Sequence, residues 1–147
     1  MKRNNVILDL DNTVISAQVL PGELKNFNYN EIGNSYRVYE RPYLQHFLDF
    51  LFTHYNVSVW TAASKDYGKF IIDNFILIKP GRRLDFFMFD THCDTSKKIT
   101  GNLKDLTLLW DFYKIPNYFS NNTIILDDNY LVYNPQPENA ILVNVFD

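Results

Sequence analysis

The architecture of this chain follows most directly from one stretch near its beginning, Val6-Ile7-Leu8-Asp9-Leu10-Asp11-Asn12-Thr13. The first three residues are apolar, as in a strand that is covered on both faces of a sheet. Two carboxylates then follow one residue apart, and a carboxylate in a dry site needs either a raised pKa or a positive partner. A magnesium ion would be such a partner, and it would let one carboxylate attack phosphorus while the other moves a proton. By itself the stretch fits a solvated turn after a strand equally well, so the remaining residues must separate the two interpretations.

Length and composition place the chain among ordinary globular α/β proteins. Its 147 residues indicate a single domain spanning 1–147, and a hydrophobic content of 46% is enough for a core. The net charge of −3 argues against a basic nucleic-acid surface. Cys93 is the single cysteine, so no internal disulfide is possible and a buried thiol is expected. The first apolar run is too short for a signal peptide or a membrane span, which predicts an intracellular protein of the cytoplasm or nucleus.

The hydrophobic pattern alternates between strands and helices along the chain. Short apolar runs predict strands over 6–10, 57–60, 84–89, 123–126 and 141–146, and helical spacing predicts helices over 41–54, 65–78 and 106–113. Residues 14–20 and 36–40 are expected to form a hairpin or flap, with 21–35 as a polar loop, while 90–102 is expected to be irregular or a small hairpin. Such alternation predicts a mostly parallel sheet with helices on both faces, whose ligand site lies beyond the carboxyl ends of the strands.

Polar groups suited to one phosphate and metal site follow three of the predicted strands. Asp9 ends the first strand, Thr61 ends the second, and Asp127-Asp128 ends another, while Lys104 lies between the last two in the chain. Each has an ordinary explanation: Thr61 fits a helix N-cap, Asp127-Asp128 fits a turn, and a single lysine is usually solvated. Their joint pattern is harder to dismiss. A response-regulator receiver also uses aspartate, threonine and lysine, but its phosphorylated aspartate follows a mid-chain strand, where this chain has Val59-Trp60-Thr61.

With these residues in place, the chain resembles the haloacid dehalogenase (HAD) superfamily and, more narrowly, its FCP/SCP-like small phosphatases, which act on the C-terminal domain of RNA polymerase II. The resemblance extends over nearly the whole chain. It is carried, in order, by Asp9-Leu10-Asp11-Asn12-Thr13 (an Asp-x-Asp-x-Thr motif), Glu40-Arg41-Pro42, Trp60-Thr61-Ala62-Ala63, Asn102-Leu103-Lys104-Asp105-Leu106, Leu126-Asp127-Asp128 and Asn139-Ala140.

The resemblance implies a HAD-like Rossmannoid three-layer fold with small flap or hairpin insertions and no separate cap domain. It implies that Asp9 is the nucleophile of a phosphomonoester hydrolase and that Asp11 is its general acid and base. Thr61 and Lys104 are implied to complete the catalytic set. Mg²⁺ is the implied cofactor, held by Asp9, Asp11 and Asp128, with Asp127 orienting the waters of the ion or Lys104. Substrate contacts are implied at Asn12, Ala62 and Tyr67.

The identity of the substrate is less sharply indicated. Asn129-Tyr130, Asp90 and Ser64 depart from the group's usual pattern, and all three departures concern substrate recognition rather than chemistry. Because no lid domain fits in this length, the site is expected to lie in an open cleft walled by 21–35 and 82–101, which favours a phosphorylated protein or peptide. At least two of Phe86, Phe87 and Phe89 are expected in the core. Two alternatives stay open: a phosphatase of nucleic-acid 3′ ends or small phosphomonoesters, and a catalytically idle binding or scaffold protein.

Overall fold

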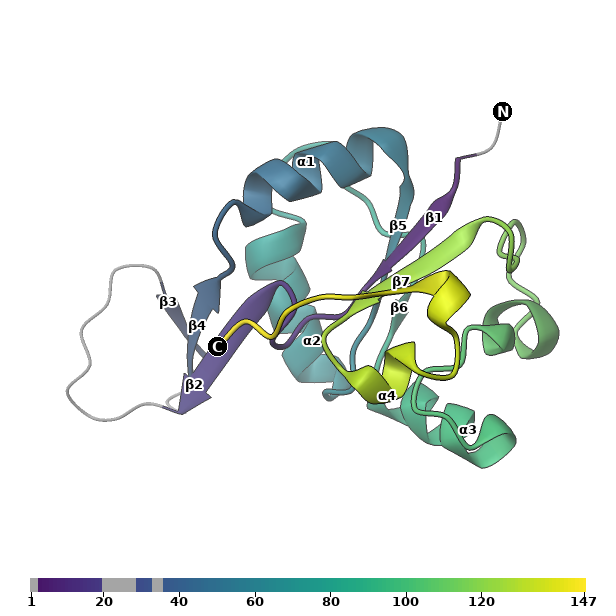
Figure 1. Ribbon diagram of the computed structural model, residues 1–147. Helices are drawn as coiled ribbons and strands as arrows, with labels where there is room; N and C mark the ends of the chain where they lie inside the picture. The colour runs from purple at the N-terminus through teal and green to yellow at the C-terminus, as the bar shows by residue number, and fades with distance from the viewer. Residues whose placement is uncertain (1–2, 20–28, 33–35) are drawn as a thin grey trace.

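A computed structural model describes residues 3–19, 29–32 and 36–147. Its centre is a five-stranded sheet in the order β6-β5-β1-β7-β8, and every neighbouring pair of strands is parallel (Figure 1). The strands are β1 (Asn5–Leu8), β5 (Asn56–Trp60), β6 (Phe87–Met88), β7 (Thr123–Asp127) and β8 (Ala140–Leu142). The predicted parallel sheet is therefore confirmed, with the motif-bearing β1 in its middle, where hydrogen bonding on both sides fixes the position of Asp9.

The two faces of the sheet carry separate hydrophobic cores. Val6 and Leu8 of β1 pack with the apolar residues of α1 (Leu44–His54), α2 (Lys65–Ile71) and the π-helix η1 (Ile72–Ile76). Ile7 points the other way because side chains alternate along a strand. The second core joins it to residues of three further helices, α3 (Asp90–Thr100), the π-helix η2 (Leu108–Phe112) and α4 (Tyr130–Tyr133). A short 3₁₀-helix, η3 (Pro137–Asn139), precedes β8. The fold is thus the expected three-layer arrangement.

The expected flap is a second, antiparallel sheet in the order β2-β4-β3. Its strands are β2 (Ile15–Val19), β3 (Tyr29–Ile32) and β4 (Tyr36–Glu40). The prediction of a loop over 21–35 is wrong for 29–32, which form β3, and the rest of that range lies outside the described residues. β2 follows the Asp11 motif directly, so the flap begins at the site itself. In the part of the chain that the structure describes, no helix has the length and apolar composition needed to cross a membrane.

Several predicted boundaries differ from the structure. Residues 90–102 were expected to be irregular, but α3 occupies most of them. Its polar sequence concealed the helix because α3 buries only the small side chains of Cys93 and Ser96. The expected strand over 84–89 is reduced to the two residues of β6, and the helix expected from residue 41 begins at Leu44, because Tyr43 takes a left-handed φ of 67°. Cys93 is buried, and Phe86 and Phe87 pack against the two cores, as expected.

One buried arginine ties α1 to the end of η1. The side chain of Arg82 is 3% exposed, and its NH1 donates to Gln45 Oε1 (2.6 Å) and to the Ile76 carbonyl (2.9 Å), while NH2 donates to the Gln45 carbonyl (3.0 Å) and Asp49 (2.7 Å). We expect Arg82→Met to lower the free energy of unfolding by about 2–4 kcal/mol, because it leaves the partly buried acceptors of Gln45 and Ile76 without donors. Chemical denaturation measures the change. The neighbouring Arg83→Met is the control and should change it by less than about 0.5 kcal/mol; equal effects of the two variants would contradict this account.

Candidate active site

The polar residues that follow the parallel strands meet in one cleft. It has a volume of about 360 Å³. Its lining comprises Asp9, Asp11, Asn12, Thr61, Ala62, Leu103, Lys104, Asp127, Asp128, Asn129 and Tyr130. All four residues whose convergence was expected from the sequence, Asp9, Thr61, Lys104 and Asp128, are among them. The prediction that 82–101 walls the cleft is wrong, since none of those residues lines it, whereas Leu103, Asn129 and Tyr130 do. The other predicted wall, 21–35, lies mostly outside the described residues.

Lys104 is the buried cation of the cleft. Its Nζ donates to Asp9 Oδ1 at 3.0 Å and to Asp127 Oδ2 at 2.7 Å, and its side chain is only 2% exposed. Burial alone would lower the pKa of this lysine, but the negative charges of Asp9 and Asp127 outweigh it and raise the pKa. Lys104 therefore stays charged at neutral pH and holds one oxygen of Asp9 in place.

Thr13 holds the other oxygen of Asp9, and the sequence analysis did not single it out. Its hydroxyl donates to Asp9 Oδ2 at 2.8 Å, lies 3.2 Å from Asp128 Oδ1, and accepts the Asp128 N–H at 3.1 Å. Thr13 thus connects the end of β1 to the residue after β7. The only available signal was its place in the Asp-x-Asp-x-Thr motif, because its contact with Asp128 joins positions 115 residues apart.

The carboxylates form a cluster suited to a divalent cation. Asp9, Asp127 and Asp128 each offer an oxygen, and these oxygens lie within 4.8 Å of one another. Burial and the charge of Asp9 raise the pKa of Asp127 to about 7. Burial, a hydrogen bond with Asp9 and the charge of Asp9 raise the pKa of Asp128. When all three carboxylates are ionised, the single ammonium of Lys104 leaves two negative charges uncompensated, so the donor set fits a hard ion such as Mg²⁺.

Asp127 and Asp128 differ in how many of their carboxylate oxygens already accept a hydrogen bond. Asp127 uses both, since Oδ2 accepts from Lys104 and Oδ1 accepts the Asn129 N–H at 2.9 Å. Asp128 makes a longer contact with Thr13 through Oδ1 and lies beside the carboxylate of Asp9. Asp128 therefore has more freedom to bind an ion, whereas Asp127 is committed to holding Lys104.

Of the remaining predicted site residues, Asp11, Asn12, Thr61 and Ala62 line the cleft, and Tyr67 contacts it through Asp11. The Tyr67 hydroxyl donates to Asp11 Oδ1, and burial raises the pKa of Asp11 in spite of that bond. Thr61 is 1% exposed, and its Oγ1 accepts the Ala63 N–H at 3.1 Å, which leaves the hydroxyl proton free for a ligand. Ala62 lines the cleft beside it. The side chain of Asn12 is turned away from this group and donates to the Phe146 carbonyl at 3.0 Å.

Tyr67 is placed to orient Asp11 through its hydroxyl. We expect Tyr67→Phe to lower kcat about tenfold with little change in KM, because Asp11 loses a charge-assisted hydrogen bond. Steady-state kinetics measure the two constants. Tyr55→Phe is the control, because Tyr55 precedes β5 whereas the cleft lies at the other end of that strand. If the ring instead contacts the substrate, Tyr67→Phe will keep full activity and Tyr67→Ala will raise KM.

Comparisons with known proteins agree with this geometry. The family model described as NLI interacting factor-like phosphatase matches residues 4–147. The CTD phosphatase-like protein 355R of Invertebrate iridescent virus 6 is 40% identical over 155 residues, which cover 97% of this chain and 85% of the viral protein. The CTD nuclear envelope phosphatase 1 homolog of Caenorhabditis elegans is 29% identical over 154 residues, or 96% of this chain and 58% of the worm protein.

A solved structure shows the same fold. Fission yeast RNA polymerase II CTD phosphatase Fcp1, bound to beryllium fluoride, superposes with a TM-score of 0.66 at 23% identity, over 99% of this chain. The match spans only 42% of the Fcp1 chain, and at this identity it confirms the HAD-like fold alone. The family model, the viral relative and the acidic cleft together show that the chain belongs to the NLI interacting factor-like phosphatase family.

Proposed function

We propose that the protein is a Mg²⁺-dependent phosphatase that removes phosphate from phosphoserine or phosphothreonine in a protein, through an aspartyl-phosphate on Asp9. The observation that carries the proposal is the double restraint on the Asp9 carboxylate, with Lys104 on one oxygen and the Thr13 hydroxyl on the other. A carboxylate held in this way at the end of a central strand is aimed into the cleft and needs no rearrangement to react.

Asp9 and Asp11 share the two steps of the reaction, which are phosphoryl transfer to the enzyme and hydrolysis of the aspartyl-phosphate. An oxygen of Asp9 attacks phosphorus, the bond to the serine or threonine oxygen breaks, and Asp11 gives that oxygen its proton. Water then attacks the phosphorus of the aspartyl-phosphate, Asp11 takes the proton, and Asp9 and inorganic phosphate are released. The raised pKa of Asp11, caused first by burial, supports its role as the proton donor of the first step.

The other cleft residues bind the phosphoryl group and the ion. Thr61 donates its free hydroxyl proton to a phosphoryl oxygen, with Ala62 beside it, and Lys104 offsets negative charge on Asp9 and the phosphate. Asp9, Asp128 and the main-chain carbonyl of Asp11 hold Mg²⁺, and Asp127 orients Lys104. When bound, the ion neutralises the charge of the incoming phosphate. Asn12 acts on the substrate through the loop that follows β1, and Tyr67 acts on it through Asp11.

The open cleft supports a macromolecular substrate. Its rim carries Tyr130, which is 58% exposed beside Asp128 and offers an aromatic surface to a residue next to the phosphorylated one. The names of the viral and worm relatives also point to a phosphorylated protein, and we extend that substrate class to this chain. We expect it to act inside the cell, in the cytoplasm or nucleus.

A substrate panel with and without Mg²⁺ tests the proposal. We expect phosphoserine or phosphothreonine peptides to be hydrolysed with a kcat/KM at least about 100-fold above that for p-nitrophenyl phosphate or a 3′-phosphorylated oligonucleotide. Chelation with EDTA should abolish the activity, and added Mg²⁺ should restore it. Preference for the oligonucleotide or the small ester would replace the phosphoprotein assignment. Absence of turnover on every substrate would favour a binding protein.

A further inference from the structure

Asn12 and Thr13 form a turn whose position sets the spacing of two site residues. Thr13 is 4% exposed, and its single hydroxyl contacts the carboxylates of Asp9 and Asp128 at 2.8 and 3.2 Å. The backbone at Asn12 is left-handed, with φ of 64°. Any shift of this turn therefore moves the hydroxyl relative to both carboxylates at once.

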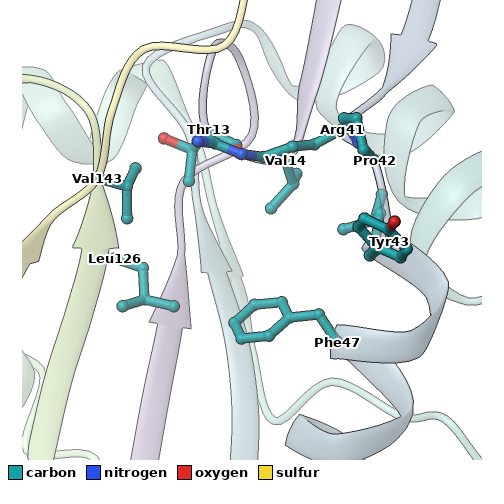
Figure 2. Close-up of a pocket in the computed structure, with 9 residues that line it drawn as sticks. Thr13, Val14, Arg41, Pro42, Tyr43, Phe47, Leu126 and Val143 are labelled. Carbon is teal, nitrogen blue, oxygen red and sulfur yellow. The ribbon is translucent and has the colours of Figure 1, made fainter.

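Behind the turn there is open space in place of packed side chains. A cavity of about 320 Å³ separates Thr13 and Val14 from the start of α1, and it is lined mainly by apolar groups such as Phe47, Leu126 and Val143 (Figure 2). Close packing normally fixes a buried segment, and none of the side chains that the structure describes packs against the turn on the side that faces this pocket. The turn must be held there by other contacts.

Besides its own backbone hydrogen bonds, such as the one from the Asn12 N–H to the Ile15 carbonyl at 2.7 Å, the turn is held by the segment Val143–Asp147 and by Arg41, which we call together the clamp. The segment leaves the sheet beside Asp127, where the Val143 N–H donates to the Asp127 carbonyl at 3.0 Å. It then runs back toward β2, as the yellow trace of Figure 1 shows. The Phe146 N–H donates to the Asn12 carbonyl at 2.8 Å, and Asn12 Nδ2 returns a bond to the Phe146 carbonyl at 3.0 Å.

Arg41 completes the clamp from the other side. Its NH1 donates to the Thr13 carbonyl at 3.1 Å and to the Asn144 carbonyl at 2.8 Å, so one guanidinium nitrogen joins the turn to the segment. The guanidinium also lies 5.8 Å from the centre of the Phe146 ring. Asn12 and Thr13 are thus each tied to the clamp through their carbonyl oxygens.

We propose that this clamp is a positioning device that sets the distance between Asp9 and Asp128 through Thr13. Arg41 and Phe146 are positioning residues, because neither lines the cleft that holds the four converging residues. The inference rests on the proposed phosphatase function, since its main readout is the rate of phosphate release. It predicts that loosening the clamp lowers kcat and the apparent affinity for Mg²⁺ but leaves substrate binding nearly unchanged.

Proline at position 146 tests one bond of the clamp. Phe146→Pro removes both the aromatic ring and the N–H that donates to Asn12. Phe146→Ala removes the aromatic ring but keeps this N–H. Val145→Pro controls for the effect of a proline, because the Val145 N–H makes no hydrogen bond to any residue that the structure describes. We expect Phe146→Pro to lower kcat about 10- to 100-fold, with less than about a twofold change in KM. Phe146→Ala loses only the ring contact with Arg41 and should lower kcat by about threefold at most, while Val145→Pro should keep the kcat of the parent.

Hydrogen–deuterium exchange gives a readout that does not depend on turnover. In Phe146→Pro the amides of residues 12–15 should exchange faster, while those of the central strands keep their protection. Arg41→Ala should show the same local change, and Arg41→Lys should recover part of kcat because an ammonium can still reach a carbonyl. Equal kcat in the proline and alanine variants, or a lowered Tm with unchanged kcat and exchange, overturns the clamp. A parent protein with no activity on any substrate overturns the proposed function instead.

Discussion

Asp9→Asn is expected to abolish turnover while the fold stays intact. The amide that replaces the carboxylate is a very weak nucleophile, so no aspartyl-phosphate forms and kcat should fall at least about 10⁴-fold. The amide has nearly the shape of the carboxylate and keeps an oxygen for Lys104 or Thr13 to donate to. Removing one negative charge from a cluster of three carboxylates relieves repulsion, so Tm should stay the same or rise.

The measurement combines kinetics with chemical trapping. Parent enzyme quenched during turnover of a radiolabelled phosphopeptide should carry label that hydroxylamine removes, and Asp9→Asn should carry none. Asp94→Asn, on the exposed surface of α3, is the matched control and should keep full activity and labelling. Normal activity in Asp9→Asn would show that another group attacks phosphorus. Labelled protein in that variant would place the intermediate elsewhere.

The sequence contained enough to predict the convergence of the cleft. Apolar runs identify the central strands, and the polar residue directly after each run can be read without knowing the strand order. Parallel strands with helical crossovers place all such residues at one edge, so Asp9, Thr61 and Asp128 had to lie near each other once the sheet was recognised. The pairing order itself, with β1 between β5 and β7, does not follow from the pattern, because all three strands have an apolar centre and none is marked as an edge strand.

What the sequence did not reveal depends on contacts between distant segments or on weak local signals. α3 was missed because its helix start lacks a Ser, Thr, Asp or Asn cap: His92 Nδ1 accepts the Phe89 N–H at 2.9 Å instead. The left-handed backbone of Tyr43 was also unforeseeable, since non-glycine residues rarely adopt it. The contact of Thr13 with Asp128 exists only once β7 is in place. The hydrogen bonds between Asn12 and Phe146 likewise need the segment after β8.

Lys104→Met is the second variant with a large expected effect, and it should act on both stability and activity. The substitution keeps the apolar length of the side chain but removes the ammonium, so Asp9 and Asp127 face each other in a buried site with no cation between them. Removing one partner of a buried ion pair costs about 3–5 kcal/mol. We expect a loss of that size in the free energy of unfolding, measured by chemical denaturation in EDTA, and a fall in kcat of about 10³-fold or more. Lys98→Met, on the exposed side of α3, should change neither quantity.

A double variant separates the two effects of Lys104. In Lys104→Met with Asp127→Asn, residue 127 is neutral and can still accept the Asn129 N–H, so most of the lost stability should return. Activity should stay as low as in the single variant, because no ammonium remains to offset charge on Asp9 and the phosphoryl group. If the double variant recovers activity along with stability, Lys104 serves only to make burial of Asp127 tolerable. If Lys104→Met is as stable and active as Lys98→Met, the ammonium is not needed between the two carboxylates.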